Sequence, residues 1–167
     1  MAPKPVVVMR HGEAEPWAGT DPERRLTEEG RVQAEAVSVS IRQWVTPDVI
    51  FASPYARAQE TGRIVSQAFD PLVPLETLPM LTPEGDPRAV DRCCNSLDRS
   101  AVLVSHMPLI GHLLQVLAGH SMAVGTANAF GLVRCVSEEC ETTPRWRLAW
   151  SARPFCERSE EHTSELQ

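Results

Sequence analysis

The sequence lacks the features that secreted, membrane and metal-binding proteins usually carry. Among its 167 residues, no stretch approaches the roughly 20 apolar residues that a membrane span needs. The first apolar run, at 6–9, is too short for the core of a signal peptide. The five cysteines form an odd set without a CxxC pair, which predicts neither a disulfide framework nor a zinc site. We therefore expect a reduced, cytoplasmic protein with no membrane partner.

Basic charge is also scarce, with 16 Lys and Arg against 22 Asp and Glu and a formal net charge of −6. Nonspecific nucleic-acid binders are usually basic overall, so this balance argues against nucleic acid as the partner, although it leaves a local basic pocket open. The sequence contains no GxGxxG, GxxxxGK[ST], GxSxG or HExxH motif. Dinucleotide-binding, P-loop, serine-hydrolase and zincin functions therefore lack support.

The apolar runs that are present predict alternating strands and helices. Short runs predict buried strands at 6–9, 49–52 and 101–104, with a further short strand at 75–78 and later strands near 127–136 and 146–150. Amphipathic spacing predicts helices that begin after Thr27, after Ser53, near Arg88 and at Pro108, with Gly119 stopping the last of them. This order is typical of a mostly parallel sheet covered on both faces.

Chemically useful side chains follow three of the predicted strands. Arg10, His11 and Gly12 follow the first strand, Arg57 lies one turn into the helix after the second, and His106 follows the third. Ligands bind at the carboxyl ends of parallel strands, so these residues are expected to share one site. Two guanidinium forks suit a phosphoryl group and supply the charge that a metal would otherwise provide, so we expect no metal and no cofactor.

A neutral histidine near pH 7 is a competent nucleophile, and two neighbouring cations would keep the pKa of His11 from rising. Gly12 would allow a sharp turn and a close approach to a ligand. Taken alone, Arg57 is best interpreted as a solvated charge and His106 as a hydrogen-bonded loop residue. A functional site is favoured only because these residues and Arg10-His11-Gly12 all lie at predicted strand ends. Trp17 either covers the mouth of the site or is simply an exposed loop aromatic. The remaining candidates are expected to be structural or exposed: His112, His120, Cys93 and Cys94.

Four motifs at 7–15, 26–34, 53–61 and 104–108 resemble the histidine phosphatase (phosphoglycerate mutase-like) superfamily, and within it the small bacterial phosphohistidine phosphatases. The resemblance runs from about 6 to 150. It implies a three-layer α/β/α sandwich with a mostly parallel central sheet, and a covalent phosphohistidine intermediate. By carry-over from the family, His11 is the nucleophile, Arg10 and Arg57 hold the phosphoryl oxygens, and His106 completes the pocket. Met107 joins the substrate-binding residues.

The resemblance also implies a partner, a phosphohistidine-bearing phosphotransfer or phosphocarrier protein, and a site that phosphate or sulfate can occupy. Many members of the superfamily carry an acidic proton donor where this sequence has Met80, which leaves Glu84 and Glu13 as nearby substitutes. Because phosphohistidine needs such an acid less than an ester does, its absence favours a phosphoramidate substrate. A small-molecule phosphatase of the same fold and a catalytically idle phosphohistidine-binding module are the alternatives.

We expect a single domain over residues 1–157. The stretch 158–167 has no apolar periodicity and resembles translated sequencing-adapter read-through. It is therefore predicted to be a flexible, non-native tail.

Overall fold

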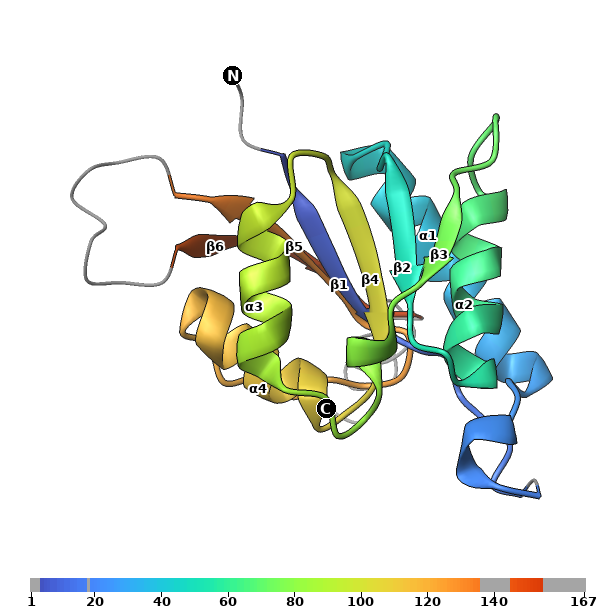
Figure 1. Ribbon diagram of the computed structural model, residues 1–167. Coiled ribbons are helices and arrows are strands. Elements are labelled where there is room, and N and C mark those ends of the chain that lie inside the picture. Colours follow the sequence, from blue (N-terminus) through green and yellow to red (C-terminus); the bar gives the residue numbers. More distant parts are fainter. Residues whose placement is uncertain (1–3, 18, 136–144, 155–167) are drawn as a thin grey trace, which may run out of the picture.

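The computed structural model describes residues 4–17, 19–135 and 145–154, and its strands and helices alternate along the chain (Figure 1). The predicted tail lies outside the described residues. The strands are β1 (Val6–Arg10), β2 (Val49–Ala52), β3 (Leu75–Thr77), β4 (Ala101–Ser105), β5 (Ala129–Arg134) and β6 (Trp146–Ala152). The helices are α1 (Glu28–Trp44), α2 (Ala56–Gln67), α3 (Pro87–Ser96) and α4 (Leu109–Ala118), with short 3-10 turns η1 (Asp21–Glu23) and η2 (Pro79–Leu81).

The six strands form one sheet in the order β3-β2-β4-β1-β5-β6. Strands β3, β2, β4 and β1 are mutually parallel, whereas β5 runs antiparallel to both β1 and β6. This arrangement confirms the predicted mostly parallel sheet. The register pairs Arg10 with Ser105 and Ala52 with Val104, so the carboxyl ends of β1, β4 and β2 lie side by side.

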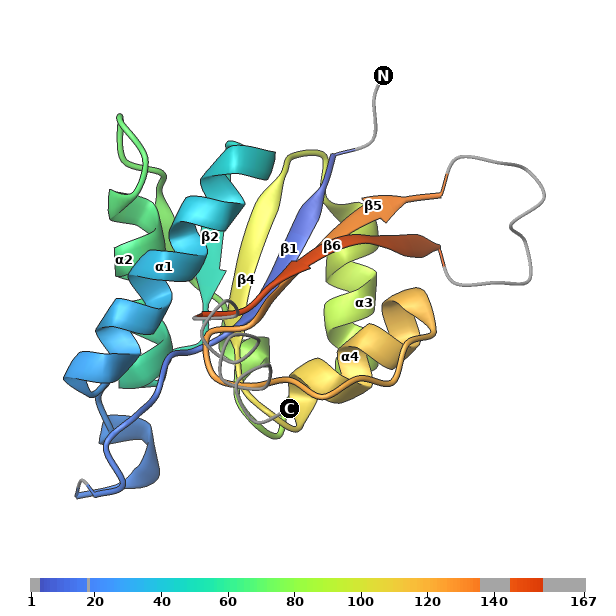
Figure 2. The same ribbon diagram turned by 180° about the vertical axis from the view of Figure 1, so that it is seen from behind.

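Helices cover both faces of the sheet, which confirms the three-layer α/β/α sandwich (Figures 1 and 2). Val7 and Met9 of β1 pack in a core cluster with α1 and α2, whereas Val6 and Val8 pack in a second cluster with α3 and α4. Because these strands are buried on both faces, their sequences are unbroken apolar runs and do not alternate between apolar and polar residues.

Helix α1 shows how directly the sequence specifies its ends and its buried face. Thr27 is the N-cap, and its Oγ1 accepts a hydrogen bond from the Gly30 N–H at 2.9 Å. Ala34, Val37 and Ile41 form the buried stripe that their spacing predicts. At the end of α4, Gly119 adopts the left-handed conformation with φ of 70°, which confirms the predicted stop.

The predicted start of α2 was wrong. Ser53 does not cap the helix, which begins at Ala56 with Tyr55 as its N-cap. The Ser53 hydroxyl instead accepts a hydrogen bond from the Tyr55 N–H at 3.2 Å and contacts His106, so it is committed to a turn and to the site.

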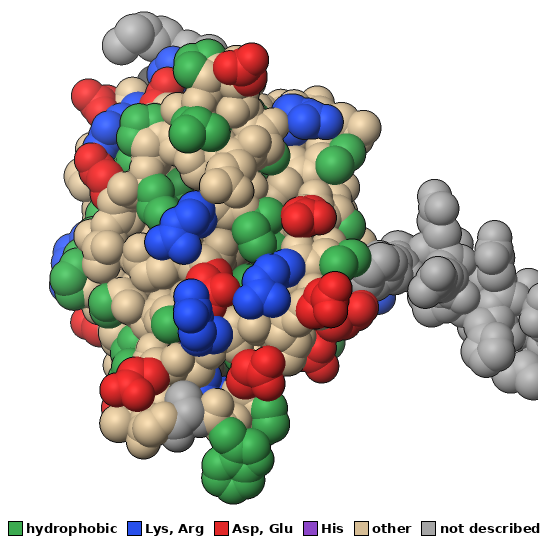
Figure 3. Space-filling model, turned by 90° about the vertical axis from the view of Figure 1, so that its right-hand side faces the viewer, with side chains coloured by type: hydrophobic (Ala, Val, Ile, Leu, Met, Phe, Trp, Pro, Cys, Tyr) green, Lys and Arg blue, Asp and Glu red, His purple; other side chains and the backbone are tan. Residues whose placement is uncertain are grey.

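Charged side chains of both signs are interspersed on the face of the molecule shown in Figure 3.

Trp17 is 85% exposed, which favours the simpler of its two interpretations, an exposed loop aromatic. None of the helices in the described ranges is both long and apolar enough to cross a bilayer.

Candidate active site

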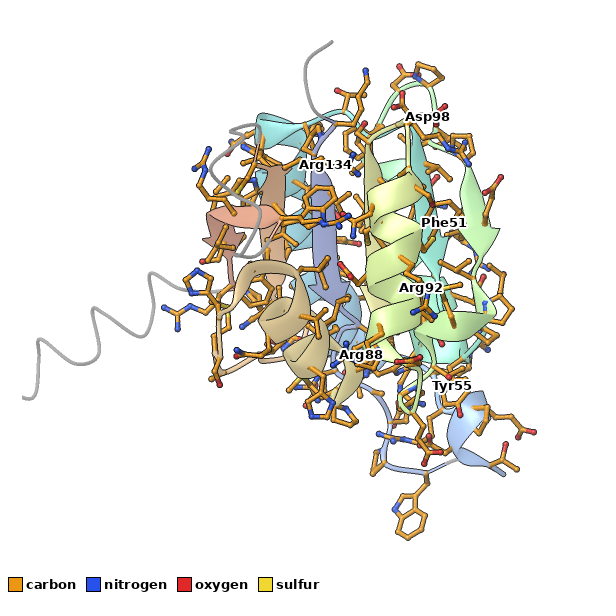
Figure 4. All side chains as sticks on the ribbon, turned by 60° about the vertical axis from the view of Figure 1, so that its left-hand side comes forward. Phe51, Tyr55, Arg88, Arg92, Asp98 and Arg134 are labelled. Atoms are coloured by element: carbon orange, nitrogen blue, oxygen red, sulfur yellow. The ribbon has the colours of Figure 1, made fainter. Side chains whose placement is uncertain are left out.

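The fold brings together the four residues predicted to share a site. Arg10 ends β1 and His11 follows it, His106 follows β4, and Arg57 is the second residue of α2. The rings of His11 and His106 have centroids 5.0 Å apart, and Arg57 Nε lies 3.3 Å from His11 Nε2. Tyr55, whose ring packs against His106, lies at the end of the sheet opposite Asp98 (Figure 4). The predicted convergence at the carboxyl edge is confirmed.

The hydrogen bonds of His11 determine which of its nitrogens carries the proton. His11 Nδ1 lies 2.6 Å from the carbonyl oxygen of Gly12, and a carbonyl only accepts, so Nδ1 is the protonated nitrogen. His11 Nε2 receives the N–H of Arg57 Nε, which requires a lone pair on Nε2. The structure therefore holds His11 as a neutral imidazole with an unprotonated Nε2.

Gly12 makes a close contact that the sequence did not predict. A Cβ at Gly12 would collide with the backbone carbonyl of Gly30 in α1, so glycine permits a close approach to this helix. The φ of Gly12 also lies outside the left-handed region, so no special turn requires glycine here. Its N–H donates to Thr61 Oγ1 of α2 at 3.1 Å, which anchors the residue whose carbonyl contacts His11 Nδ1.

Both histidines are held in the neutral form. Burial is the largest cause that lowers the pKa of His11 to about 4, and the positive charges of Arg57 and Arg10 act in the same direction. The hydrogen bond to Gly12 acts against them. As predicted, the neighbouring cations lower the pKa of His11, but desolvation lowers it more. Burial, followed by the nearby His11 and Arg57, lowers the pKa of His106 to about 3.

These two histidines should make the protein acid-sensitive. In the unfolded chain each gains a proton as the pH falls through about 6.5, whereas in the folded state each stays neutral until about pH 4 or below. Stability is therefore lost as the pH drops through this window. We expect the free energy of unfolding, measured by urea denaturation, to fall by roughly 4 kcal/mol between pH 7.5 and pH 5.

The control for this measurement is the exposed His112 on α4. The variant His112→Asn should keep the full pH dependence, and the double variant His11→Asn with His106→Asn should lose most of it. Equal stability of the wild-type protein at both pH values would contradict the assignment of two buried neutral histidines.

Both arginines present guanidinium groups at the site. Arg57 is 4% exposed, and its two terminal nitrogens donate to the backbone oxygen of Asp21 at 2.8 Å and to Asp21 Oδ2 at 3.2 Å. Arg10 donates to the Val124 carbonyl at 2.8 Å, while its buried Nε has no partner among the described residues. A buried donor without an acceptor is unfavourable, so a phosphoryl oxygen would satisfy a group that the protein leaves open.

Asp21 is a second site contact, besides Ser53, that sequence reasoning missed. It lies in the polar loop after β1, where no periodicity or motif distinguishes it from its neighbours. Hydrogen bonds from Arg24 and Arg57 hold the pKa of its carboxyl below the usual value. The predicted substitutes for an acid lie elsewhere: Glu13 bonds to Thr27 Oγ1 at the start of α1, and Glu84 is exposed before α3.

The carboxylate of Asp21 should compete with anions for Arg57. Removing its charge in Asp21→Asn is expected to tighten inhibition by inorganic phosphate by about 2- to 10-fold, the modest size reflecting an ion pair whose carboxylate is about half exposed. The measurement is the phosphate inhibition constant at fixed ionic strength. Glu23→Gln, in the same 3-10 turn, is the matched control and should leave that constant unchanged. Weaker phosphate inhibition of Asp21→Asn would contradict the competition.

The other predicted residues lie at the margins of this cluster. Met107 is half-buried between β4 and α4, where it packs against the core on the side of α3 and α4. Met80 lies in η2 and packs against the same core. Within the described ranges, no group of three or more His, Cys, Asp or Glu side chains is placed to hold a metal ion.

Comparison with known proteins identifies relatives of this chain. Residues 6–82 match the histidine phosphatase superfamily, branch 1. The chain is 36% identical to a phosphohistidine phosphatase SixA homolog of Haemophilus influenzae over 126 residues, covering 68% of this chain and 77% of that protein. It is 30% identical to the phosphohistidine phosphatase SixA of Escherichia coli over 150 residues, covering 86% and 92%.

The fold agrees with the sequence relationship. A solved structure of the protein histidine phosphatase SixA with tungstate superposes with a TM-score of 0.79 at 27% identity, covering 90% of this chain and 97% of that one. The chain belongs to the histidine phosphatase superfamily, as a phosphatase similar to SixA.

Proposed function

We propose that the protein removes phosphoryl groups from phosphohistidine on a signalling phosphotransfer or phosphocarrier protein. The observation that carries this proposal is the state of His11. Its Nε2 is unprotonated and is held against the Arg57 guanidinium, and the positive charge of Arg10 also acts on the His11 ring. A nitrogen lone pair surrounded by positive charge is suited to attack a phosphorus atom and to hold the product.

The reaction would have two displacement steps. In the first, the Nε2 lone pair of His11 attacks phosphorus, and the bond from phosphorus to the substrate imidazole breaks. The imidazole leaves with that electron pair, as a neutral ring when its other nitrogen already carries a proton. In the second, water attacks the phosphohistidine on His11, releases inorganic phosphate and restores Nε2. Arg10 and Arg57 would bind the equatorial oxygens in both steps.

The ionised state of Asp21 supports a phosphoramidate substrate. An alkoxide leaving group needs a proton donor, and Asp21, held ionised by Arg24 and Arg57, is poorly suited to supply one. Met80 stands where we expected the acid of other family members. An imidazole that leaves as a neutral ring requires no such donor.

The choice of a protein partner rests on the relatives, which are named as phosphohistidine phosphatases. A single catalytic unit over residues 1–157 and a cytoplasmic location both stay predictions. The same applies to the expected absence of metal and cofactor.

A substrate panel tests the proposal. A phosphotransfer domain and a phosphocarrier protein, each phosphorylated on histidine, would be compared with free phosphohistidine and with sugar phosphates. We expect the highest kcat/KM on a phosphohistidine protein. The opposite ranking would indicate a small-molecule phosphatase, and saturable binding without turnover on any substrate would indicate an idle binding module.

A further inference from the structure

We propose that Ser53 is a positioning residue that fixes His106 as the neutral tautomer with its proton on Nδ1, and so adds a further donor for the phosphoryl group to those of Arg10 and Arg57. The tautomer follows from the geometry alone, whereas its effect on the rate rests on the proposed function. Nothing in the motif pattern indicates this role, because the sequence suggests a helix cap at Ser53.

The hydroxyl of Ser53 has two neighbours. Its oxygen accepts the N–H of Tyr55 at 3.2 Å and lies 2.8 Å from His106 Nε2. Ser53 is fully buried and His106 is 1% exposed, so neither group is open to solvent. The direction of the contact between Ser53 and His106 is therefore decided by the protein groups around it.

Only one direction of this hydrogen bond satisfies both the Ser53 hydroxyl and His106 Nε2. If Nε2 carried the proton and donated it to Ser53, the hydroxyl hydrogen would be buried, with no acceptor among the described contacts. If the hydroxyl donates instead, Nε2 accepts with its lone pair and the serine satisfies both of its hydrogen bonds. The single proton of the neutral imidazole then resides on Nδ1.

Nδ1 of His106 is buried and has no hydrogen-bond partner among the described residues. The assigned tautomer makes this atom an N–H donor, and the ring lies 5.0 Å from that of His11. The two histidines would thus carry the same tautomer for opposite purposes. His11 donates its Nδ1 proton to Gly12 and has its lone pair on Nε2, where Arg57 contacts it. His106 accepts from Ser53 through Nε2 and has its proton donor on Nδ1.

The backbone holds Ser53 firmly in this place. Its N–H donates to the Val104 carbonyl at 3.1 Å, and its carbonyl accepts from Gln59 Nε2 at 2.8 Å. The Tyr55 ring packs edge-on against His106 with centroids 5.0 Å apart, which limits rotation of the imidazole. The hydroxyl therefore has a fixed position from which to donate, as expected of a group that orients an active histidine.

Nitrogen NMR of the full chain labelled with ¹⁵N-histidine tests the assignment without any substrate. At pH 7 we expect His106 to show a protonated Nδ1 and an unprotonated Nε2, with the signal identified by its loss in His106→Gln. A protonated Nε2 in the wild-type protein, with or without a proton on Nδ1, would overturn the proposal. This readout requires no Ser53 variant to fold, and it stands even if the proposed substrate is wrong.

The variant Ser53→Ala tests the consequence. We expect the tautomer of His106 to become mixed, and kcat to fall by about 10- to 100-fold while KM changes less than about 3-fold. The matched control is Ser66→Ala, which removes a different buried hydroxyl, one that lies in α2 and bonds to the Val73 carbonyl, and it should change neither readout. A folded Ser53→Ala protein with wild-type tautomer and wild-type kcat would refute the role.

Discussion

Replacing His11 by alanine is expected to lower the turnover of a phosphohistidine protein by at least about 10³-fold. The variant loses the only group placed by the proposed mechanism to form a bond to phosphorus, and the arginines alone leave water as the attacking nucleophile. The measurement is release of inorganic phosphate under single-turnover conditions. Rapid quenching in alkali, where phosphohistidine survives, should trap ³²P on the wild-type protein and none on His11→Ala.

The control is His112→Ala, which removes an exposed imidazole from α4 and should retain full turnover and full labelling. Retention of more than a tenth of the wild-type rate by His11→Ala would remove His11 from the role of nucleophile. Labelling of His11→Ala at another residue would do the same.

Replacing Arg57 by lysine should lower kcat/KM by about 10²- to 10³-fold, even though the positive charge remains. The guanidinium of Arg57 contacts His11 through Nε and reaches Asp21 through both terminal nitrogens, so one planar fork spans the proposed nucleophile and the carboxylate that phosphoryl oxygens would replace in the proposed mechanism. A lysine ammonium is a single point donor and cannot make both contacts. Stopped-assay kinetics on the phosphohistidine protein measure the loss.

Arg63→Lys is the matched control, because Arg63 lies exposed on the same helix. It should change kcat/KM by less than about 2-fold. If Arg57→Lys behaved like Arg63→Lys, charge alone would suffice at this position, and the proposed bidentate binding of phosphoryl oxygens would be incorrect.

The sequence predicted those features that depend on local pattern and on sheet topology. Thr27 and Gly119 mark helix ends because their chemistry acts within a few residues. The convergence of His11, Arg57 and His106 was predictable because parallel strands present their carboxyl ends at one edge. Neither inference requires knowledge of side-chain packing.

What escaped prediction depends on contacts between distant segments. The role of Gly12 depends on the backbone of Gly30, and that of Ser53 depends on His106. Asp21 reaches Arg57 only because its loop folds back over the start of α2. In each case the residue type permits several local structures, and a distant partner selects one of them.

The position of β4 in the sheet has a consequence for how activity arises during synthesis. Strand β4 lies between β1 and β2, and its pairing joins Val6 to Ala101. A nascent chain that ends before β4 already carries Arg10, His11 and Arg57, but it lacks the strand that brings them together. Pairing β1 with β4 closes the long segment of chain between Val6 and Ala101, which is slow relative to forming the helices. Catalysis should therefore appear only once β4 has paired with β1 and β2, so that enzyme activity itself reports the insertion of this strand.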